Sequence, residues 1–210
     1  MDIIAEKKKG KGWITLNRPH ALNALSLPMI KDLHDLFYLW NKDPDMTEII
    51  IQGEGKAFCA GGDLKSVYQA QHCDKNFLEA IFRIEYTANL RLKNLSKPYV
   101  ALLQGYVMGG GMGASVHGSH RIATDSTCMA MPETKIGYFP DVGASYFLNQ
   151  CPGFTGLYLG LTGKSIDASD ALYVGWATHY VPLKHWDSLK KIVADDTIEK
   201  ALYLSESLES

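Results

Sequence analysis

Hydrophobic residues recur along this chain at two spacings, one typical of strands and one typical of helices. Residues 1–16 form two short apolar runs on either side of Lys7, Lys8 and Lys9, a pattern that predicts two strands joined by a solvated turn. Residues 17–26 are expected to form a loop, and Ser26 is placed to cap the helix that follows. This helix is predicted over residues 27–41 because apolar side chains recur there at helical spacing, at Ile30, Leu33, Phe37 and Trp40.

Strands and helices alternate through most of the remaining sequence. Continuous apolar runs at residues 47–53 and 98–105 are typical of buried strands, and a long helical pattern covers residues 74–95 between them. The alternation predicts an α/β core with mostly parallel strands. The other expected segments are a loop at 55–63, a turn into a helix at 105–118, short strands at 120–126 and 127–133, and helices from residue 143 onward.

Composition and charge exclude several classes of protein. The 210 residues are 46% hydrophobic and 21% charged, so the chain can bury a sizeable core. A formal net charge of -2 provides no positive field to recruit nucleic acid or an anionic membrane surface. No apolar run reaches the roughly 18 residues of a membrane span, and the charged N-terminus does not resemble a signal or transit peptide. We therefore expect a cytoplasmic protein, or a mitochondrial one if a presequence has been removed, with no membrane or nucleic-acid partner.

Several common catalytic patterns are missing from the sequence. Ser115 and Ser145 lack the second glycine of a G-x-S-x-G motif, which disfavours a serine-triad hydrolase. The histidines show no metal-ligand spacing, and His117 and His120 are expected to satisfy core hydrogen bonds instead. Neither a metal site nor a bound cofactor is expected. Reduced thiols are expected because no CxxC pair occurs among the four cysteines, Cys59, Cys73, Cys128 and Cys151.

Two glycine-rich loops follow apolar runs and lead toward helices. Gly61 and Gly62 lie in FCAGGD, and Gly109, Gly110 and Gly111 lie in MGGGMG. Glycine lets the backbone approach a ligand closely, and the start of a helix offers unpaired N–H donors. Two such donors aimed at one point would form an oxyanion hole, although close packing of two turns requires the same glycines.

A dinucleotide-binding loop is a rival interpretation of the second glycine loop. Residues 109–114 satisfy G-x-G-x-x-A after an apolar run. The acid expected about 20 residues further on, however, has only Glu133 as a poor candidate. No Walker-type phosphate-binding sequence is present.

Three carboxylates lie in apolar surroundings. Glu85 falls on the apolar face of the helix predicted over residues 74–95, and Glu133 and Asp141 lie in MPETKIGYFPD. Each has a structural interpretation: Glu85 as a buried hydrogen-bonding partner, Glu133 as a cap after Pro132, and Asp141 as the N-cap of a following helix. A desolvated carboxylate can also act as a base, an acid or a nucleophile at neutral pH. The residues alone leave both interpretations open.

Several longer segments together resemble the crotonase, or enoyl-CoA hydratase/isomerase, superfamily. They are ITLNRPHALNALS, KAFCAGGDLK, KPYVALLQGYVMGGGMGASVHG and MPETKIGYFPDVGASYFL. Within the superfamily, FRIEY, GGGMGASVHGSHRIAT and LTGKSIDASDALYVGWATHYV resemble the 3-hydroxyisobutyryl-CoA hydrolases. The resemblance implies a spiral of ββα units and an acyl-CoA substrate, with coenzyme A as part of that substrate.

The same resemblance implies a role for each candidate residue. It implies that the amides of Gly62 and Gly110 form the oxyanion hole, and that Glu133 attacks the thioester carbonyl or activates water. Asp141 would position a hydroxyl or water and pass a proton to the leaving thiolate, and Glu85 would hydrogen-bond the acyl hydroxyl. The phosphates of CoA would be bound by Arg18, His20 and Lys65.

The residue after the glycine run favours hydrolysis over hydration. The resemblance implies that hydratases hold water with two glutamates, one matching Glu133 and one at the position of Gly113, which has no side chain here. Asp141 supplies another carboxylate, in the arrangement of the acyl-CoA hydrolases. We therefore expect hydrolysis of 3-hydroxyisobutyryl-CoA to 3-hydroxyisobutyrate and CoA, a step of valine breakdown. The alternatives are an enoyl-CoA hydratase or isomerase and a non-catalytic structural paralogue in a larger assembly.

The expected domain organisation is a crotonase-like core over residues 1–190 and the start of a helical C-terminal segment over residues 191–210. Residues 197–210 resemble an amphipathic helix that ends abruptly, with residues 205–210 as a frayed tail. The hydrolase subgroup continues further, so the resemblance implies a truncated segment. Apolar surface left by missing helices would favour a homo-oligomer or a covering partner.

Overall fold

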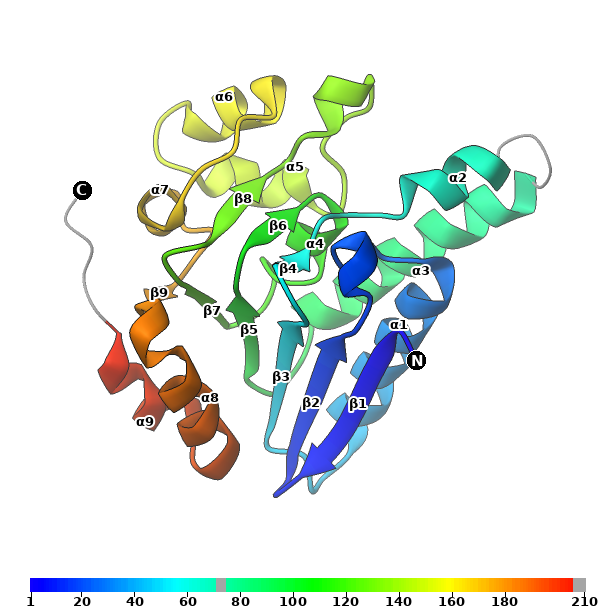
Figure 1. Cartoon of the computed structure of the whole chain (residues 1–210). Coiled ribbons are helices and arrows are strands. Elements are labelled where there is room, and N and C mark those ends of the chain that lie inside the picture. The colour runs from blue at the N-terminus through cyan, green and yellow to red at the C-terminus, as the bar shows by residue number, and fades with distance from the viewer. Residues whose placement is uncertain (71–74, 206–210) are drawn as a thin grey trace.

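Two sheets of unequal size carry the fold (Figure 1). The structure is a computed structural model, which describes residues 1–70 and 75–205. Within these residues, β1 and β2 pair antiparallel and the other neighbouring strands are parallel, which confirms the predicted α/β core. The six-stranded sheet has the order β1 (Ile3–Lys8), β2 (Lys11–Leu16), β3 (Glu48–Gly53), β5 (Tyr99–Leu103), β7 (His120–Ala123), β9 (His179–Tyr180). The three-stranded sheet has the order β4 (Ala57–Cys59), β6 (Tyr106–Met108), β8 (Cys128–Ala130).

Helices cover both faces of the large sheet, with α1 and α3 on one face and α8 and α9 on the other (Figure 1). No described helix combines the length and the apolar composition that a bilayer-spanning segment needs. The α-helices are α1 (Leu27–Lys42), α2 (Leu64–Ala70), α3 (Lys75–Lys93), α4 (Gly110–Gly113), α5 (Ala144–Phe147), α6 (Thr155–Thr162), α7 (Ala168–Tyr173), α8 (Trp186–Asp195) and α9 (Ile198–Ala201). Short 3-10 helices are η1 (Pro19–Ala21), η2 (Glu133–Ile136), η3 (Leu148–Gln150), η4 (Leu183–His185) and η5 (Leu202–Leu204).

Strand β3 shows why the central strands are continuously hydrophobic in sequence. Successive side chains of a strand point to opposite faces. Ile49 and Ile51 belong to the core cluster that includes α1 and α3, whereas Ile50 packs with Trp186 and Leu189 of α8. All three isoleucines are fully buried. A strand that is covered on both faces therefore shows no polar alternation.

The N-terminal predictions are confirmed, with a shorter turn than expected. Lys7 and Lys8 belong to β1, and the turn consists of Lys9 and Gly10, both at positive φ. This conformation is the one that tight hairpin turns adopt. Ser26 caps α1, because its side-chain oxygen accepts the N–H of Met29 at 3.5 Å.

The structure differs from the predictions at the glycine-rich segments. Residues 55–63, predicted as a loop, contain β4, and residues 105–118 contain β6 ahead of the four-residue helix α4. Strands of three residues are too short to show a hydrophobic alternation, and they form here because they pair with one another in the small sheet. From residue 143 onward the helical prediction is confirmed by α5 to α9, with β9 as a two-residue strand between them. At the C-terminus, α9 and η5 replace the single predicted helix, and residues 206–210 lie outside the described residues.

A buried ion pair fastens the C-terminal helices to the large sheet. The register of β2 and β3 places Lys11 opposite Glu48, and Lys11 Nζ lies 3.0 Å from Glu48 Oε2. Lys11 Nζ also donates to the backbone carbonyls of Val193 and Asp196, at the end of α8. Glu48 Oε1 accepts the N–H of Ile198, at the start of α9. The domain boundary at residue 190 stays a prediction, and that residue lies inside α8.

Candidate active site

The small sheet gathers the candidate residues at one edge. Its strands are parallel, so their C-terminal ends lie together. The first strand, β4, leads into Gly61 and Gly62, β6 leads into Gly109 and Gly110, and β8 leads into Glu133. Residues far apart in the sequence therefore meet in one place.

The two glycine loops are in contact. A methyl group placed on Gly110 would lie 3.3 Å from the Gly62 nitrogen, and one placed on Gly61 would lie 3.8 Å from the Gly110 nitrogen. Within the described part of the chain, neither the Gly62 N–H nor the Gly110 N–H donates to a protein acceptor. Neighbouring unpaired donors of this kind are what the binding of an oxyanion requires.

Glu85 and Glu133 lie against these same loops. A methyl group on Gly110 would be 2.8 Å from Glu85 Oε1, and one on Gly109 would be 2.7 Å from Glu133 Oε1. Any side chain at either position would therefore collide with a carboxylate, and Gly109 also has a φ of 51°. A dinucleotide loop is disfavoured, because α4 is only four residues long and Glu133 packs on the loop itself.

The three carboxylates are buried without a neutralising cation. Glu85 and Glu133 are 8% and 9% exposed, and Asp141 is half-buried. Glu133 Oε2 has no hydrogen-bond partner among the described residues. None of the three acids forms an ion pair within residues 1–70 and 75–205. Such an arrangement is costly for a folded protein unless the acids share protons or bind a ligand.

Burial raises the pKa of all three acids, and the charges of neighbouring carboxylates add to this at Glu85 and Glu133. Burial, with smaller contributions from the charges of Asp141 and Glu133, raises the pKa of Glu85 to about 8. Burial and the Asp141 charge raise the pKa of Glu133 to about 7. Burial also raises the pKa of Asp141. Carboxyl groups that titrate near neutral pH can both accept and donate protons.

Asp141 is held by a tyrosine that the sequence analysis missed. The Tyr86 hydroxyl donates to Asp141 Oδ2 at 2.7 Å and lies 3.4 Å from the Tyr138 hydroxyl. Asp141 is not a helix N-cap, because α5 begins at Ala144 after Gly143. Tyr86 directly follows Glu85 in the sequence, but 55 residues separate it from Asp141, so no spacing rule could pair them.

Position 113 has no room for a second glutamate. A methyl group on Gly113 would lie 2.7 Å from Val142 Cβ and 3.0 Å from Asn89 Nδ2. A longer side chain would have to displace the segment that follows Asp141. The space that a side chain at position 113 would need is therefore filled by the protein's own packing.

The candidates for binding CoA phosphates fall into two groups. Arg18 pairs with Asp63, with Nη2 2.9 Å from Oδ2, and donates through Nη1 to the carbonyl of Ala24 at 3.0 Å. These contacts tie residues 17–26 to the loop that carries Gly62. His20 and Lys65 are exposed. The CoA-binding roles of Arg18, His20 and Lys65 stay predictions.

Metal ligation and disulfide bonding can be described only for part of the chain. In residues 1–70 and 75–205, His, Cys, Asp and Glu side chains form no group of three or more that could hold a metal ion. Cys59, Cys128 and Cys151 are free thiols, and Cys73 lies outside the described residues. Cys59 is fully buried under the first glycine loop, where its sulfur lies 3.5 Å from the Gly61 nitrogen.

Comparison with known proteins identifies the family of this chain. The chain belongs to the enoyl-CoA hydratase/isomerase family, whose sequence profile matches residues 11–209. Within that family it is similar to 3-hydroxyisobutyryl-CoA hydrolases. A probable 3-hydroxyisobutyryl-CoA hydrolase 3 of Arabidopsis thaliana is 50% identical over 181 residues, which cover 86% of this chain and 48% of that protein. The mitochondrial 3-hydroxyisobutyryl-CoA hydrolase of Danio rerio is 47% identical over 195 residues, which cover 92% of this chain and 51% of that protein.

Solved structures share the fold over the whole of this chain. A carnitinyl-CoA dehydratase from Mycobacterium thermoresistibile superposes with a TM-score of 0.95 at 35% identity, over 100% of this chain and 62% of that one. An enoyl-CoA hydratase from Rhodobacter sphaeroides gives a TM-score of 0.92 at 36% identity, with the same coverage. The expected crotonase-like fold is confirmed. The chain spans about half the length of the curated relatives it matches.

Proposed function

We propose that this chain hydrolyses a short 3-hydroxyacyl-CoA thioester, with 3-hydroxyisobutyryl-CoA as the first candidate substrate. The observation that carries the proposal is the contact of both glycine loops with buried acids, Glu85 Oε1 against Gly110 and Glu133 Oε1 against Gly109. A thioester oxygen gains negative charge when its carbon is attacked. A hydrogen-bond donor at such an oxygen contributes about 3 kcal/mol to transition-state stabilisation. The amides of Gly62 and Gly110 are the donors that we assign to this role.

The proposed reaction forms a carbon–oxygen bond and breaks the carbon–sulfur bond. Glu133 either removes a proton from the attacking water or attacks the carbonyl carbon itself, forming an anhydride that water then hydrolyses. Asp141 relays the proton released from the water to the departing CoA thiolate, so the products are the free acid and CoA and both carboxylates return to their starting state. Borohydride added during turnover separates the two routes. It would reduce a Glu133 anhydride to an alcohol that is detectable by peptide mass, whereas a free Glu133 carboxylate would not react.

The protonation states of the acids support these roles. With a pKa of about 7, Glu133 is substantially ionised at neutral pH, as a base or nucleophile must be. With a pKa of about 8, Glu85 keeps its proton at neutral pH and can donate a hydrogen bond to the hydroxyl of a 3-hydroxyacyl group. The Tyr86 hydroxyl, which donates to Asp141, orients the proton carrier.

Hydration of an enoyl-CoA is the second candidate function. It is favoured by the names of the two structural neighbours, a dehydratase and a hydratase. The packing of Gly113 against Val142 disfavours it, because the second glutamate of the hydratase water site has no space at that position.

Thiol release tests the proposal directly. We expect the chain to liberate free CoA thiol from 3-hydroxyisobutyryl-CoA, measured with a thiol reagent, and to leave the absorbance of crotonyl-CoA unchanged. The Glu133→Gln variant should lose thiol release, whereas Glu79→Gln, an exposed position on α3, should retain it. Hydration of crotonyl-CoA without thiol release would reject the proposal in favour of the second candidate. Because 3-hydroxypropionyl-CoA lacks only one methyl group, we expect at most a roughly 100-fold preference between the two substrates.

The proposal requires no cofactor beyond the CoA carried by the substrate. Relatives from Danio rerio and Mus musculus are named as mitochondrial proteins, and the compartment of this chain stays a prediction.

Phe154 and Leu161 are 85% and 67% exposed around α6. Their coverage by a second copy or by a partner also stays a prediction.

A further inference from the structure

The segment after Asp141 has an unusual backbone. Val142 is only 2% exposed and has a φ of 43°, in the left-handed region that a β-branched residue rarely adopts. Gly143 follows with a φ of 87°, and α5 begins at Ala144. The Ala144 N–H donates to the Asp141 carbonyl at 2.7 Å, which closes the turn. A strained turn of this kind persists only where its surroundings hold it.

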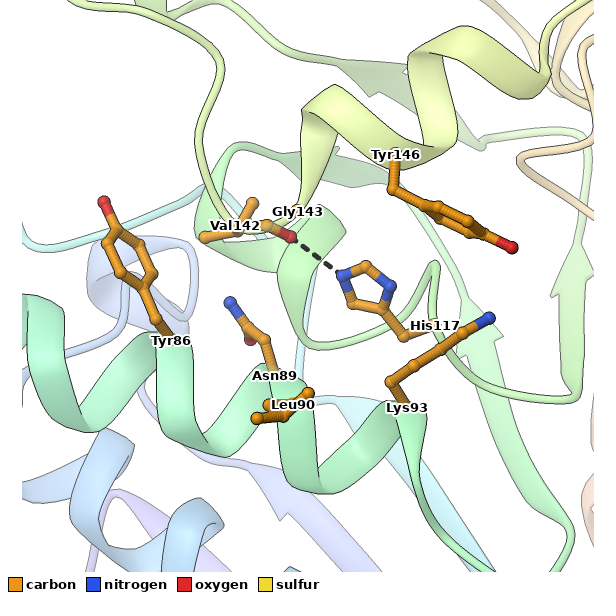
Figure 2. Close-up of a pocket in the computed structure, with 8 residues that line it drawn as sticks. All are labelled: Tyr86, Asn89, Leu90, Lys93, His117, Val142, Gly143 and Tyr146. Atoms are coloured by element: carbon orange, nitrogen blue, oxygen red, sulfur yellow. Dashed lines mark hydrogen bonds between the residues drawn. The ribbon is translucent and has the colours of Figure 1, made fainter.

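One side chain from another segment holds this turn. His117, which follows α4, donates through Nε2 to the Val142 carbonyl at 2.8 Å (Figure 2). A methyl group on Gly143 would lie 2.7 Å from the His117 ring, so the imidazole packs directly on the turn. The ring also meets Phe147 of α5 edge-on, with centroids 6.0 Å apart. His117 is therefore in contact with the turn and with the helix that follows it.

We propose that His117 is a positioning residue for Asp141, because its hydrogen bond holds the Val142 turn in the conformation that directs the Asp141 carboxylate to Tyr86 and the acid cluster. The catalytic consequence rests on the proposed hydrolase function. His117 does not touch the acids itself, so its role is to position Asp141 and not to react.

The surroundings of His117 keep the ring a neutral donor. A carbonyl oxygen is the acceptor, so Nε2 carries the proton. Burial lowers the pKa of His117, and although the hydrogen bond to Val142 raises it, the positive charges of Lys93 on α3 and Arg121 on β7 lower it further, so the net shift is downward. Beyond the ring lies a cavity of about 350 Å³ between α3 and the turn, lined among others by Asn89, Lys93 and Tyr146 (Figure 2). The hydrogen bond to the Val142 carbonyl is therefore made by the neutral ring, and titration of His117 near neutral pH would not break it.

Two substitutions separate positioning from mere core filling. His117→Phe keeps a ring in the core but removes the donor, whereas His117→Gln keeps an N–H that can reach the Val142 carbonyl. We expect His117→Phe to lower kcat for thiol release about 100-fold, as for a displacement of about 1 Å at a catalytic group, with KM changed less than threefold. His117→Gln should recover most of the lost kcat. The control is His120→Gln, a half-buried histidine on β7 that contacts Ser119 and not the turn.

A second measurement needs no turnover. The charge of Asp141 raises the pKa of Glu133, so a displaced Asp141 should lower it. Carboxyl carbon NMR titration should therefore show Glu133 titrating at lower pH in His117→Phe than in the wild type, and near the wild-type value in His117→Gln. Adding His117→Phe to Asp141→Asn should produce little further shift, because both act through the same carboxylate. A wild-type Glu133 titration in His117→Phe would overturn the inference.

The outcomes also separate the inference from the proposed function. A wild-type chain that releases no thiol from any 3-hydroxyacyl-CoA rejects the hydrolase proposal, and the titration then decides the role of His117. An active wild type with unchanged kcat in His117→Phe rejects the positioning role and leaves the hydrolase proposal intact.

Discussion

Charge is buried at two places in this molecule, against the large sheet and at the edge of the small one. Lys11 and Glu48 are 6% and 5% exposed, and each also satisfies backbone groups of the C-terminal helices. Glu85 and Glu133 are buried to a similar degree, but the charges near them are those of other acids. Beyond the effect of burial, Asp141 and Glu133 raise the pKa of Glu85 and Asp141 raises that of Glu133, and no cation is paired to them in the described part of the chain. The two groups of residues are therefore equally buried, but the first pairs opposite charges and the second brings acids together.

We interpret this difference as the one between a structural ion pair and the proposed catalytic site. A buried ion pair whose remaining hydrogen-bonding groups are satisfied can be tolerated in a fold, because each charge compensates the other. Buried acids that lie close together cannot all ionise without destabilising the fold, and groups of acids with raised pKa values are typical of sites that bind a ligand or carry out a reaction. On this argument, substitutions at the first site change stability and those at the second change activity, and the following predictions test that separation.

The largest expected effect is at Glu133. Replacing it with Gln should lower kcat for thiol release at least about 1,000-fold, because the side chain loses its ability to act as base or nucleophile. The free energy of unfolding, measured in urea at pH 8, should stay the same or rise, because one buried negative charge is removed. A variant that loses activity and unfolds at much lower urea would place Glu133 with the structural charges.

The second prediction concerns the ion pair. Lys11→Met should lower the free energy of unfolding by about 4 kcal/mol, because Glu48 is left buried without its cation. Lys11→Met with Glu48→Met should lower it by less than the single change. The control is Lys9→Met: its partner, Asp195, is exposed, and a surface pair of this kind contributes about 0–1 kcal/mol. If the double variant were as unstable as the single one, the helix caps rather than the pair would carry the stability.

The third prediction concerns pH. Glu85 has its pKa raised from 4.5 to about 8 in the folded protein, so its contribution to stability is fully present below pH 4.5 and is lost as the pH rises through about 8. The free energy of unfolding should therefore fall from pH 5 to pH 9. Glu85→Gln should remove about 4 kcal/mol of that fall. Urea unfolding across this range checks it, with Glu79→Gln on the same helix as the control. Parallel curves for Glu85→Gln and the wild type would contradict the assignment.

Much of the fold follows from local sequence, and the site follows less directly. The isoleucines of β3 and the Ser26 cap indicate their elements because a continuous apolar run or a capping side chain acts within a few residues. Strands β4 and β6 give no such signal, because three residues show no period and form a sheet only when they are brought together. The glycines and acids were predicted to share a site through the order of their motifs in a known family.

The local sequence does not show which residues from distant segments pair with one another. Lys11 faces Glu48 because of the register between β2 and β3, and Tyr86 reaches Asp141 across 55 residues. His117 was expected to satisfy a core hydrogen bond, which the structure confirms, but its acceptor is 25 residues away. Each pairing depends on the assembled fold, so it appears only once the sheets and α3 are placed.

The smallest expected effect compares a glycine beside each charged site. A methyl group on Gly12, next to Lys11, would lie 2.3 Å from the Trp40 ring, and one on Gly113 would lie 2.7 Å from Val142 Cβ. Gly12→Ala and Gly113→Ala should each cost about 2 kcal/mol of unfolding free energy, because both overpack a filled space. Only Gly113→Ala should also lower kcat for thiol release, since it pushes on the Val142 turn that carries Asp141. Combining it with Val142→Ala should restore part of the activity, because the substitution removes Val142 Cγ1, which would lie 3.0 Å from the added methyl group, and keeps only the contact with Cβ. Equal kcat values for Gly12→Ala and Gly113→Ala would show that packing beside the acids does not set their geometry, and the contrast between the two sites would then rest on charge alone.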